Sequence, residues 1–172
     1  CDLLAAAVED MARVGCTDVL ALDGRYRHFP GESWTSPPEQ AEAIRAACKK
    51  RGLGCVIESV EDMTEVQKRT RLFEMAYEAG ATRTDWLFVS DADHKIARAR
   101  DLRPLFEDAD GDTFNVYGVE GDTSRFSNQT QGKWVRLAFR AVPGLHVHPD
   151  AHWIYLDGDG RILWGFNSIT AE

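Results

Sequence analysis

The stretch DWLFVSDADH, residues 85–94, decides the fold of this chain. Its apolar run, Trp86 to Val89, shows no polar alternation, which is typical of a strand buried on both faces in a parallel sheet. Two carboxylates, Asp91 and Asp93, follow the run directly. In open α/β sheets ligands bind just beyond the carboxyl ends of the strands, and residues i and i+2 of an extended chain point the same way. The stretch therefore predicts an α/β domain in which two acids face a binding crevice.

Two carboxylates in a crevice suit a divalent cation that in turn holds a diphosphate, because such cations prefer oxygen ligands. The spelling Asp91-Ala92-Asp93 matches a D-x-D motif. Taken alone, a D-x-D tripeptide is more often a solvated loop, so its meaning depends on the context. Here the context favours the functional interpretation, because the acids follow an apolar strand and alternating helix and strand signals precede them.

The chain ahead of this stretch alternates between helix and strand patterns. Ser36, Pro37 and Glu39 predict a helix start, with Ser36 as N-cap and Pro37 at the first helical position. The expected order is a helix over 3–14, a strand over 18–22, a helix from 36 to about 52, a strand over 55–57 and a helix over 63–79. A β-α-β-α-β order implies a parallel sheet with right-handed crossovers.

Beyond Asp93 the pattern becomes mixed and antiparallel. We expect a short helix over 99–106, strands over 113–119 and 134–140, and a strand over 153–156 that pairs with 161–164. The segment Asp157-Gly158-Asp159-Gly160 has hairpin chemistry. It resembles part of a calcium loop but lacks the downstream acid, so we interpret it as a turn. The chain is therefore expected to be one domain over 1–172, with an α/β half over 1–97 and a mixed half over 98–172. This layout resembles that of a GT-A domain, and the resemblance implies that the first half binds the nucleotide and the second the acceptor.

Composition limits the classes of function. With 172 residues and 44% hydrophobic content, the chain is long enough for one domain with a sizeable core. A net charge of −8 argues against sequence-independent binding of nucleic acid, because such binding needs clustered basic residues. No apolar stretch approaches the roughly 20 residues of a membrane span. The four cysteines have no C-x-x-C spacing, which favours reduced thiols in a cytoplasmic protein.

Several pieces of the chain together resemble a known family. They are VLALDGRYRHFPG, SPPEQAEAI, EVQKR and DWLFVSDADH, with HWIYLDGDGRILWG as a weaker match near the end. In this order they resemble the small family-2-type glycosyltransferases of actinobacteria and their phages, which have a GT-A fold and a DxD motif. Such domains open with a strand beside the nucleotide, whereas this chain starts in the helix that follows it. The resemblance implies that this first strand, and part of the donor pocket, is missing from the sequence.

The resemblance also implies a set of nucleotide-binding residues: Asp23, Lys68, Arg69 and Asp91. Asp23 ends a strand before a glycine and matches the acid that contacts the nucleoside, although turn chemistry explains an Asp-Gly pair equally well. Lys68 and Arg69 match a basic pair on the helix before the DxD strand. Helical phase places Arg69 near the middle of an apolar stripe and Lys68 at its edge. A guanidinium there needs a buried carboxylate or the donor's diphosphate as partner, and we favour the diphosphate.

The expected metal ligands are Asp91, Asp93 and His152. GT-A enzymes often take a third ligand from a histidine of the second half, and His152 matches that position. A lone histidine is more often structural, but three of the five histidines of this chain fall within 146–152, which favours a ligand role. Carboxylates with an imidazole suit Mn²⁺ somewhat better than Mg²⁺.

The resulting hypothesis is a glycosyltransferase, hexosyl or pentosyl, that moves a sugar from a nucleoside diphosphate donor to an acceptor hydroxyl. The resemblance favours a UDP-sugar as donor. Inversion would need a carboxylate base, for which Glu120 and Asp122 are weak candidates because both equally fit solvated loop acids. Inversion or retention of the anomeric centre therefore stays open.

Two other functions remain as alternatives. A nucleotidyltransferase of similar fold would carry a Gly-rich basic loop after its first strand, and the sequence shows none. A non-catalytic module that binds nucleotide sugars would keep the fold without the chemistry, and the intact acids and Arg69 speak against it. The acceptor is not defined by the sequence. Phage relatives suggest a modified DNA base, which the acidic balance does not support.

Overall fold

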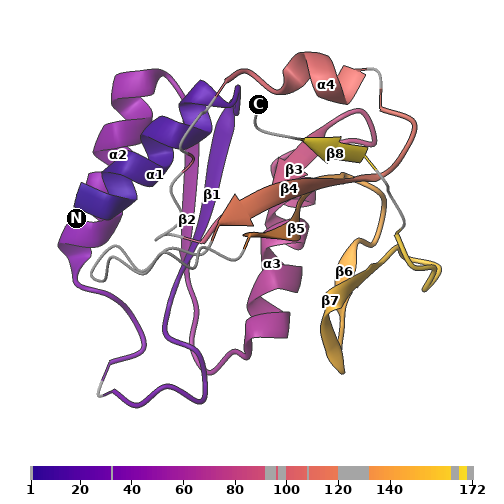
Figure 1. Ribbon diagram of the computed structural model, residues 1–172. Coiled ribbons are helices and arrows are strands. Elements are labelled where there is room, and N and C mark those ends of the chain that lie inside the picture. Colours follow the sequence, from indigo (N-terminus) through magenta and orange to yellow (C-terminus); the bar gives the residue numbers. More distant parts are fainter. Residues whose placement is uncertain are drawn as a thin grey trace.

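The computed structural model describes residues 2–31, 33–91, 96, 100–107, 109–119, 132–163 and 167–169, with backbone alone for 115–119, 132–136, 152 and 167–169. Its first half alternates helices and strands as the sequence predicts (Figure 1). The elements are α1 (Asp2–Arg13), β1 (Asp18–Asp23), α2 (Pro38–Arg51), β2 (Gly54–Ser59), α3 (Glu65–Glu78) and β3 (Trp86–Phe88).

Strands β1 and β2 form a parallel pair, from Asp18 opposite Gly54 to Asp23 opposite Ser59. Helices α1 and α2 pack together on one side of the pair, and α3 lies on the other side (Figure 1). A small cluster centred on Val8, Ala47 and Cys48 joins α1 and α2 to the strands. This arrangement follows from the right-handed crossovers expected of β-α-β units.

The ends of the helices differ in part from the sequence prediction. Helix α2 begins at Pro38 with Pro37 as N-cap residue and without a side-chain cap, so the expected capping by Ser36 is wrong. The Ser36 backbone N–H is instead bound by the carboxylate of Asp23, at 3.0 Å to Oδ1. The predicted stop of α2 is confirmed, because Gly52 adopts the left-handed conformation, φ 70°, that favours glycine.

Helix α3 starts with a full capping box. Thr64 accepts from the backbone N–H of Gln67, whose side chain in turn accepts from the Thr64 N–H. The inward face of α3 buries Phe73 and Ala76, as the apolar stripe predicts. Lys68 and Arg69, the candidate basic pair, therefore lie on a helix with a well-defined start.

Strand β3 departs from the expected parallel sheet. It pairs antiparallel with β5 (Gly132–Arg140), and the sheet continues in the order β3-β5-β4-β8, with β4 (Thr113–Val119) and β8 (Asn167–Ile169). Within the described residues β3 has no ladder with β1 or β2. Its three residues are half-buried, so the expectation of a strand buried on both faces is wrong. All three residues line a large cavity, which leaves them partly open.

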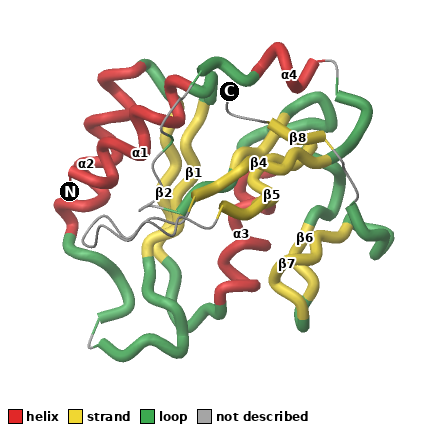
Figure 2. Tube along the Cα trace, in the orientation of Figure 1, coloured by secondary structure: helices red, strands yellow, loops and turns green. Residues whose placement is uncertain are grey.

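The second half has more strands than predicted. Between β5 and β8 lie β6 (His146–His148) and β7 (Ala151–Leu156), which form an antiparallel hairpin beside α3 (Figure 2). The predicted helix over 99–106 is the shorter α4 (Arg103–Glu107). Of the predicted pairing of β7 with 161–164, the described residues, which end at 163 here, show a bridge between Leu156 and Ile162. The segment 157–160 is a turn, as predicted, and the Asp157 carboxylate accepts backbone N–H groups within it.

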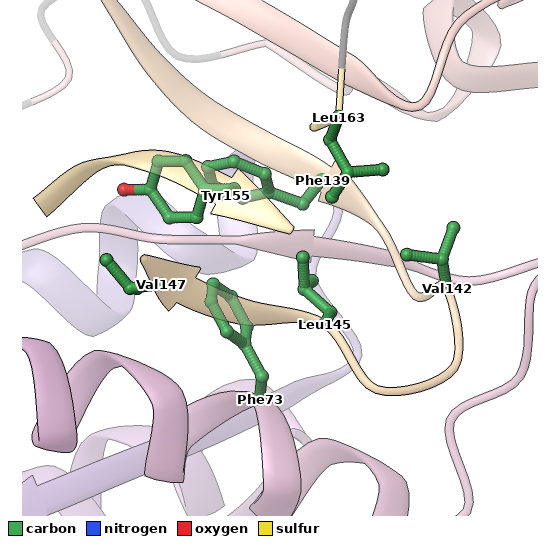
Figure 3. Close-up of a cluster of buried hydrophobic side chains, with 7 residues drawn as sticks. All are labelled: Phe73, Phe139, Val142, Leu145, Val147, Tyr155 and Leu163. Atoms are coloured by element: carbon green, nitrogen blue, oxygen red, sulfur yellow. The ribbon is translucent and has the colours of Figure 1, made fainter. Parts of the chain in front are cut away.

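The largest core cluster joins α3 to the antiparallel half (Figure 3). Its buried members are Phe73, Phe139, Val142, Leu145, Val147, Tyr155 and Leu163. Phe73 meets Phe139 edge-on, with ring centroids 5.7 Å apart. On another part of the sheet, Trp86 stacks on Phe106 of α4 at 4.7 Å. The helix that carries the candidate basic pair is thus fixed mainly by the second half of the chain.

The structure is therefore mixed α/β, with a small parallel pair and antiparallel sheets. No helix among the described residues is both long and apolar enough to cross a bilayer. Cys16, Cys48 and Cys55 are free thiols. Burial raises the pKa of the Cys16 thiol to about 11, which keeps it protonated and unreactive at neutral pH.

Candidate functional site

The candidate site lies where the carboxyl ends of β1 and β3 meet the first turns of α3. Lys68 contacts Gly24, just after β1, and Arg69 contacts Asp91, just after β3. A cavity of about 1000 Å³ reaches this place and is lined there by Gly24, Lys68, Arg69 and Asp91. The structure thus brings three of the four predicted nucleotide-binding residues, Lys68, Arg69 and Asp91, to one cavity.

Lys68 is the more deeply placed of the two cations. It is 7% exposed, donates from Nζ to the carbonyl oxygen of Gly24, and lies 4.7 Å from the ring centre of Tyr26. Burial lowers the pKa of its ammonium group, and the charge of Asp23 partly offsets this effect. Lys68 is more deeply buried than its position at the edge of the apolar stripe suggests, because Gly24 and Tyr26 of the loop after β1 contact it.

Asp23 has a local structural role in this structure. Its carboxylate accepts the Ser36 N–H with both oxygens, at 3.0 and 3.3 Å, and so ties the loop after β1 to the start of α2. It is within charge range of Lys68. Asp23 is not among the residues that line the cavity. This contact joins residues 13 positions apart, so it ties a loop to a helix and is not the turn that an Asp-Gly pair predicts; the contact of Asp23 with a nucleoside stays a prediction.

Arg69 faces the cavity from α3 and is held between two acids. Its Nε donates to Glu65 Oε1 at 3.0 Å, and its Nη2 lies 3.5 Å from Asp91 Oδ1. Burial opposes the charge of Arg69, but Tyr155, Asp91 and Glu65 outweigh it and raise the pKa of the guanidinium. The side chain is 21% exposed. A guanidinium has five N–H donors, and its contacts within the described residues use those on Nε and Nη2.

Asp91 is the predicted metal ligand whose side chain the structure describes. The side chain is 47% exposed and lies beside the cavity. Asp93 lies outside the described residues, and His152 is described by its backbone alone. In the part of the chain that the structure describes, no three side chains of His, Cys, Asp or Glu are grouped as a metal site would require. The three-ligand site therefore stays a prediction.

The second half of the chain reaches the site through β7. The strand predicted over 153–156 begins earlier, at Ala151, so His152 is the second residue of β7. On the same strand, buried Tyr155 is close enough to affect the charge of Arg69. Two other histidines make local contacts: His146 with the Gly144 carbonyl at 2.8 Å, and His148, whose Nδ1 accepts the Asp150 N–H at 3.1 Å. Glu120 and Asp122, the candidate bases, lie outside the described residues.

Three residues of the site and its surroundings escaped the sequence analysis: Glu65, Tyr155 and Asp10. Glu65 stands four residues before Arg69, a helical pair that the sequence alone reveals. Tyr26 covers Lys68, which only the return of a loop brings about. Buried Asp10 of α1 accepts the Ile96 N–H at 2.9 Å and so anchors the chain that follows the DxD acids. Its acidic side chain in an apolar helix was the available signal.

The comparisons with known proteins add no family. A scan against protein-family models and searches among curated proteins and solved structures found no match to this chain.

Proposed function

We propose that this protein is a metal-dependent glycosyltransferase of GT-A type that moves a sugar from a nucleoside diphosphate donor to an acceptor hydroxyl. The observation that carries the proposal is the position of Arg69. Its half-buried guanidinium faces a large cavity at the carboxyl ends of β1 and β3, beside an acid of the DxD motif. Ligands of α/β proteins bind at this edge of the strands.

The contacts of Arg69 suit a group that accepts from a fork of N–H donors. The distance of 3.5 Å between Nη2 and Asp91 is long for a charge-assisted hydrogen bond, which is usually about 2.7–2.9 Å. A diphosphate oxygen can therefore compete for this nitrogen while Glu65 keeps holding Nε. Lys68 donates to the carbonyl oxygen of Gly24 and adds its positive charge beside Arg69.

The metal in this proposal is Mn²⁺ or Mg²⁺, held by Asp93 with help from Asp91 and His152. Asp91 fits the role of an oxygen ligand, because its carboxylate stands exposed at the end of β3. Such a cation stabilises the charge that develops on the diphosphate leaving group as the glycosidic bond breaks. Arg69 would orient the same diphosphate, and Glu65 would orient Arg69. The acceptor base, for which Glu120 and Asp122 are the candidates, is left open.

Calorimetric titration with UDP in the presence and absence of Mn²⁺ tests the proposal. We expect Arg69→Ala to weaken binding of UDP by about 10-fold or more, because a hydrogen bond to a charged group contributes roughly 1.5–3 kcal/mol. Asp93→Ala should abolish the dependence of binding on Mn²⁺. Equal affinity of Asp93→Ala and the parent would count against the metal-diphosphate site.

Arg71→Ala is the matched control. Arg71 lies on the same helix but pairs with Glu58, Glu74 and Glu78, away from the cavity lining. Its removal should leave UDP affinity unchanged, and an equal loss in both arginine variants would point to damage to α3. Release of sugar from a UDP-sugar then separates the remaining alternatives: a binding module binds without turnover, and a nucleotidyltransferase requires a nucleoside triphosphate.

A further inference from the structure

Two of the free cysteines are neighbours where α2 meets β2. Cys48 lies in the last turn of α2 and is 1% exposed, and half-buried Cys55 is the second residue of β2. Cys55 packs against the cluster of Val8, Ala47 and Cys48 that joins α1 and α2 to the strands. Its side chain is also within hydrogen-bonding reach of the Cys48 thiol. The two thiols therefore meet inside a packed part of the molecule.

The chain between the two cysteines is short and well held. The carbonyl oxygen of Cys48 accepts the N–H groups of Gly52 and Leu53, at 3.0 Å for Leu53. The Gly54 N–H donates to the carbonyl oxygen of Thr17 at 3.0 Å, which fixes the start of β2 beside β1. Because both ends of this connection are hydrogen-bonded, the helix and the strand keep Cys48 and Cys55 together.

The two thiols differ in how readily they react. Burial raises the pKa of the Cys48 thiol to about 11, and neighbouring Cys55 adds to the rise. Cys48 is therefore protonated at neutral pH and closed to a reagent from solvent. Cys55 is partly exposed, so it is the sulfur that a reagent reaches first. A reachable thiol beside a buried one has the arrangement of an attacking and a resolving cysteine.

We propose that Cys48 and Cys55 are a redox-sensitive pair that forms a reversible disulfide between α2 and β2. Both are thiols in this structure, which is the reduced form of the pair. The oxidant is a low-molecular-weight disulfide, of which oxidised glutathione is an example. Cys16 is the natural comparison, because burial and Asp18 raise its pKa without a contribution from another described cysteine.

The reaction is a thiol–disulfide exchange in two steps. The Cys55 thiolate attacks one sulfur of the oxidant, the S–S bond of the oxidant breaks, and one molecule of thiol leaves. Cys48 then gives up its proton, its sulfur attacks the sulfur of Cys55, and the second molecule of thiol leaves. The two cysteines lose two electrons and two protons in total, and the two released thiols carry them away.

The test uses the full chain with Cys1→Ser and Cys16→Ser, so that only the proposed pair remains. The reduced protein is treated with oxidised glutathione at about 1 mM, because thiols held close on one chain have an effective concentration of that order or above. By mass spectrometry we expect most chains to lose two hydrogen atoms and to yield a peptide that joins Cys48 to Cys55. Dithiothreitol should reverse the change. The bridge should also raise the melting temperature by about 5 °C.

Two control chains keep Cys16 and one member of the pair. With Cys1→Ser and Cys48→Ala, glutathione should stay on Cys55, and at least about 10-fold less chain should be bridged, because no resolving thiol is near. With Cys1→Ser and Cys55→Ala, the folded chain should resist glutathione, because Cys48 is buried. Rapid modification of Cys48 in that chain would overturn the order of attack.

Three results would overturn the pair itself. An equal share of bridged chain in the Cys48→Ala control would show that any two thiols of this protein pair. Glutathione that stays on Cys55 while Cys48 is present would show that the folded chain holds the sulfurs apart. A bridged chain that melts below the reduced one would show the same. The proposal does not rest on the proposed function, because neither cysteine lines the cavity, so it can be tested whether or not UDP binds.

Discussion

The two halves of the molecule differ in how well they bury the apolar residues that their sequences supply. Among the side chains that the structure describes, the antiparallel half and α3 share a cluster of seven buried ones, whereas α1, α2, β1 and β2 share one of three. Yet β1 has a purely apolar centre, from Val19 to Leu22, and every one of these residues is only half-buried. Local pattern and burial are therefore separate properties: a strand with a strong apolar pattern stays half-exposed where its residues line a cavity.

The same division runs through the candidate site. Lys68, on the β1 side, is engaged by Gly24 and covered by Tyr26. Arg69, on the β3 side, faces the cavity and keeps a long contact to Asp91. The two cations are neighbours in sequence, but successive residues of a helix point about 100° apart. Lys68 therefore makes a structural contact, whereas Arg69 can contact a ligand. Both side chains line the cavity, but Lys68 already donates to Gly24, whereas the long contact of Arg69 to Asp91 is one that a ligand can replace.

The largest expected effect is on the core of the antiparallel half. Phe73→Ala should lower the free energy of unfolding by about 3–5 kcal/mol, because Phe73 is nearly fully buried among aromatic and aliphatic side chains. Leu20→Ala in half-buried β1 should cost only about 1 kcal/mol. Urea unfolding measures both. Similar losses in the two variants would mean that β1 is as well packed as the antiparallel half and would break the comparison.

A smaller effect concerns Lys68, on the β1 side of the site, and its contribution to stability at different pH values. Because burial lowers the pKa of Lys68 in the folded state, the unfolded chain holds this proton more tightly. The parent should therefore gain stability relative to Lys68→Met as pH rises from the lowered pKa toward the ordinary lysine value. Urea unfolding of both proteins at pH 8 and pH 10 measures this difference. A difference that is independent of pH would show that Lys68 is not desolvated by the loop after β1.

The smallest expected effect is electrostatic: residues near the end of β3 change the pKa of Tyr26, which follows β1. Burial, followed by Asp91 and Glu65, raises the pKa of the Tyr26 phenol, while Arg69 lowers it. Asp91→Asn should therefore lower the pKa of Tyr26 toward its ordinary value, and Arg69→Ala should raise it further. Carbon NMR of labelled tyrosine rings follows this titration. An unchanged Tyr26 in both variants would place the ends of β1 and β3 farther apart than the structure has them.

Much of the first half could be predicted from the sequence, because its signals are local. The apolar run of β1, the stop of α2 at Gly52 and the stripe of α3 each depend on residues a few positions apart. The same applies to the turn at 157–160, where the Asp157 side chain binds N–H groups of its own loop. The strand-end rule placed Asp91 at a binding crevice, and the resemblance added Lys68 and Arg69; the structure brings all three to one cavity. The roles of Asp93, His152, Glu120 and Asp122 stay predictions.

By itself, the sequence determined where the chain forms helices and strands and which edge of the parallel strands would carry charged side chains, since periodicity and strand-end chemistry are properties of neighbouring residues. Only the tertiary structure decided how those pieces associate. It paired β3 antiparallel with β5, turned Asp23 toward Ser36, and covered Lys68 with Tyr26. These outcomes depend on contacts between residues far apart in the chain. Which backbone groups are hydrogen-bonded and which side chains are buried depends on the packing of the whole molecule, and no short stretch of sequence encodes it.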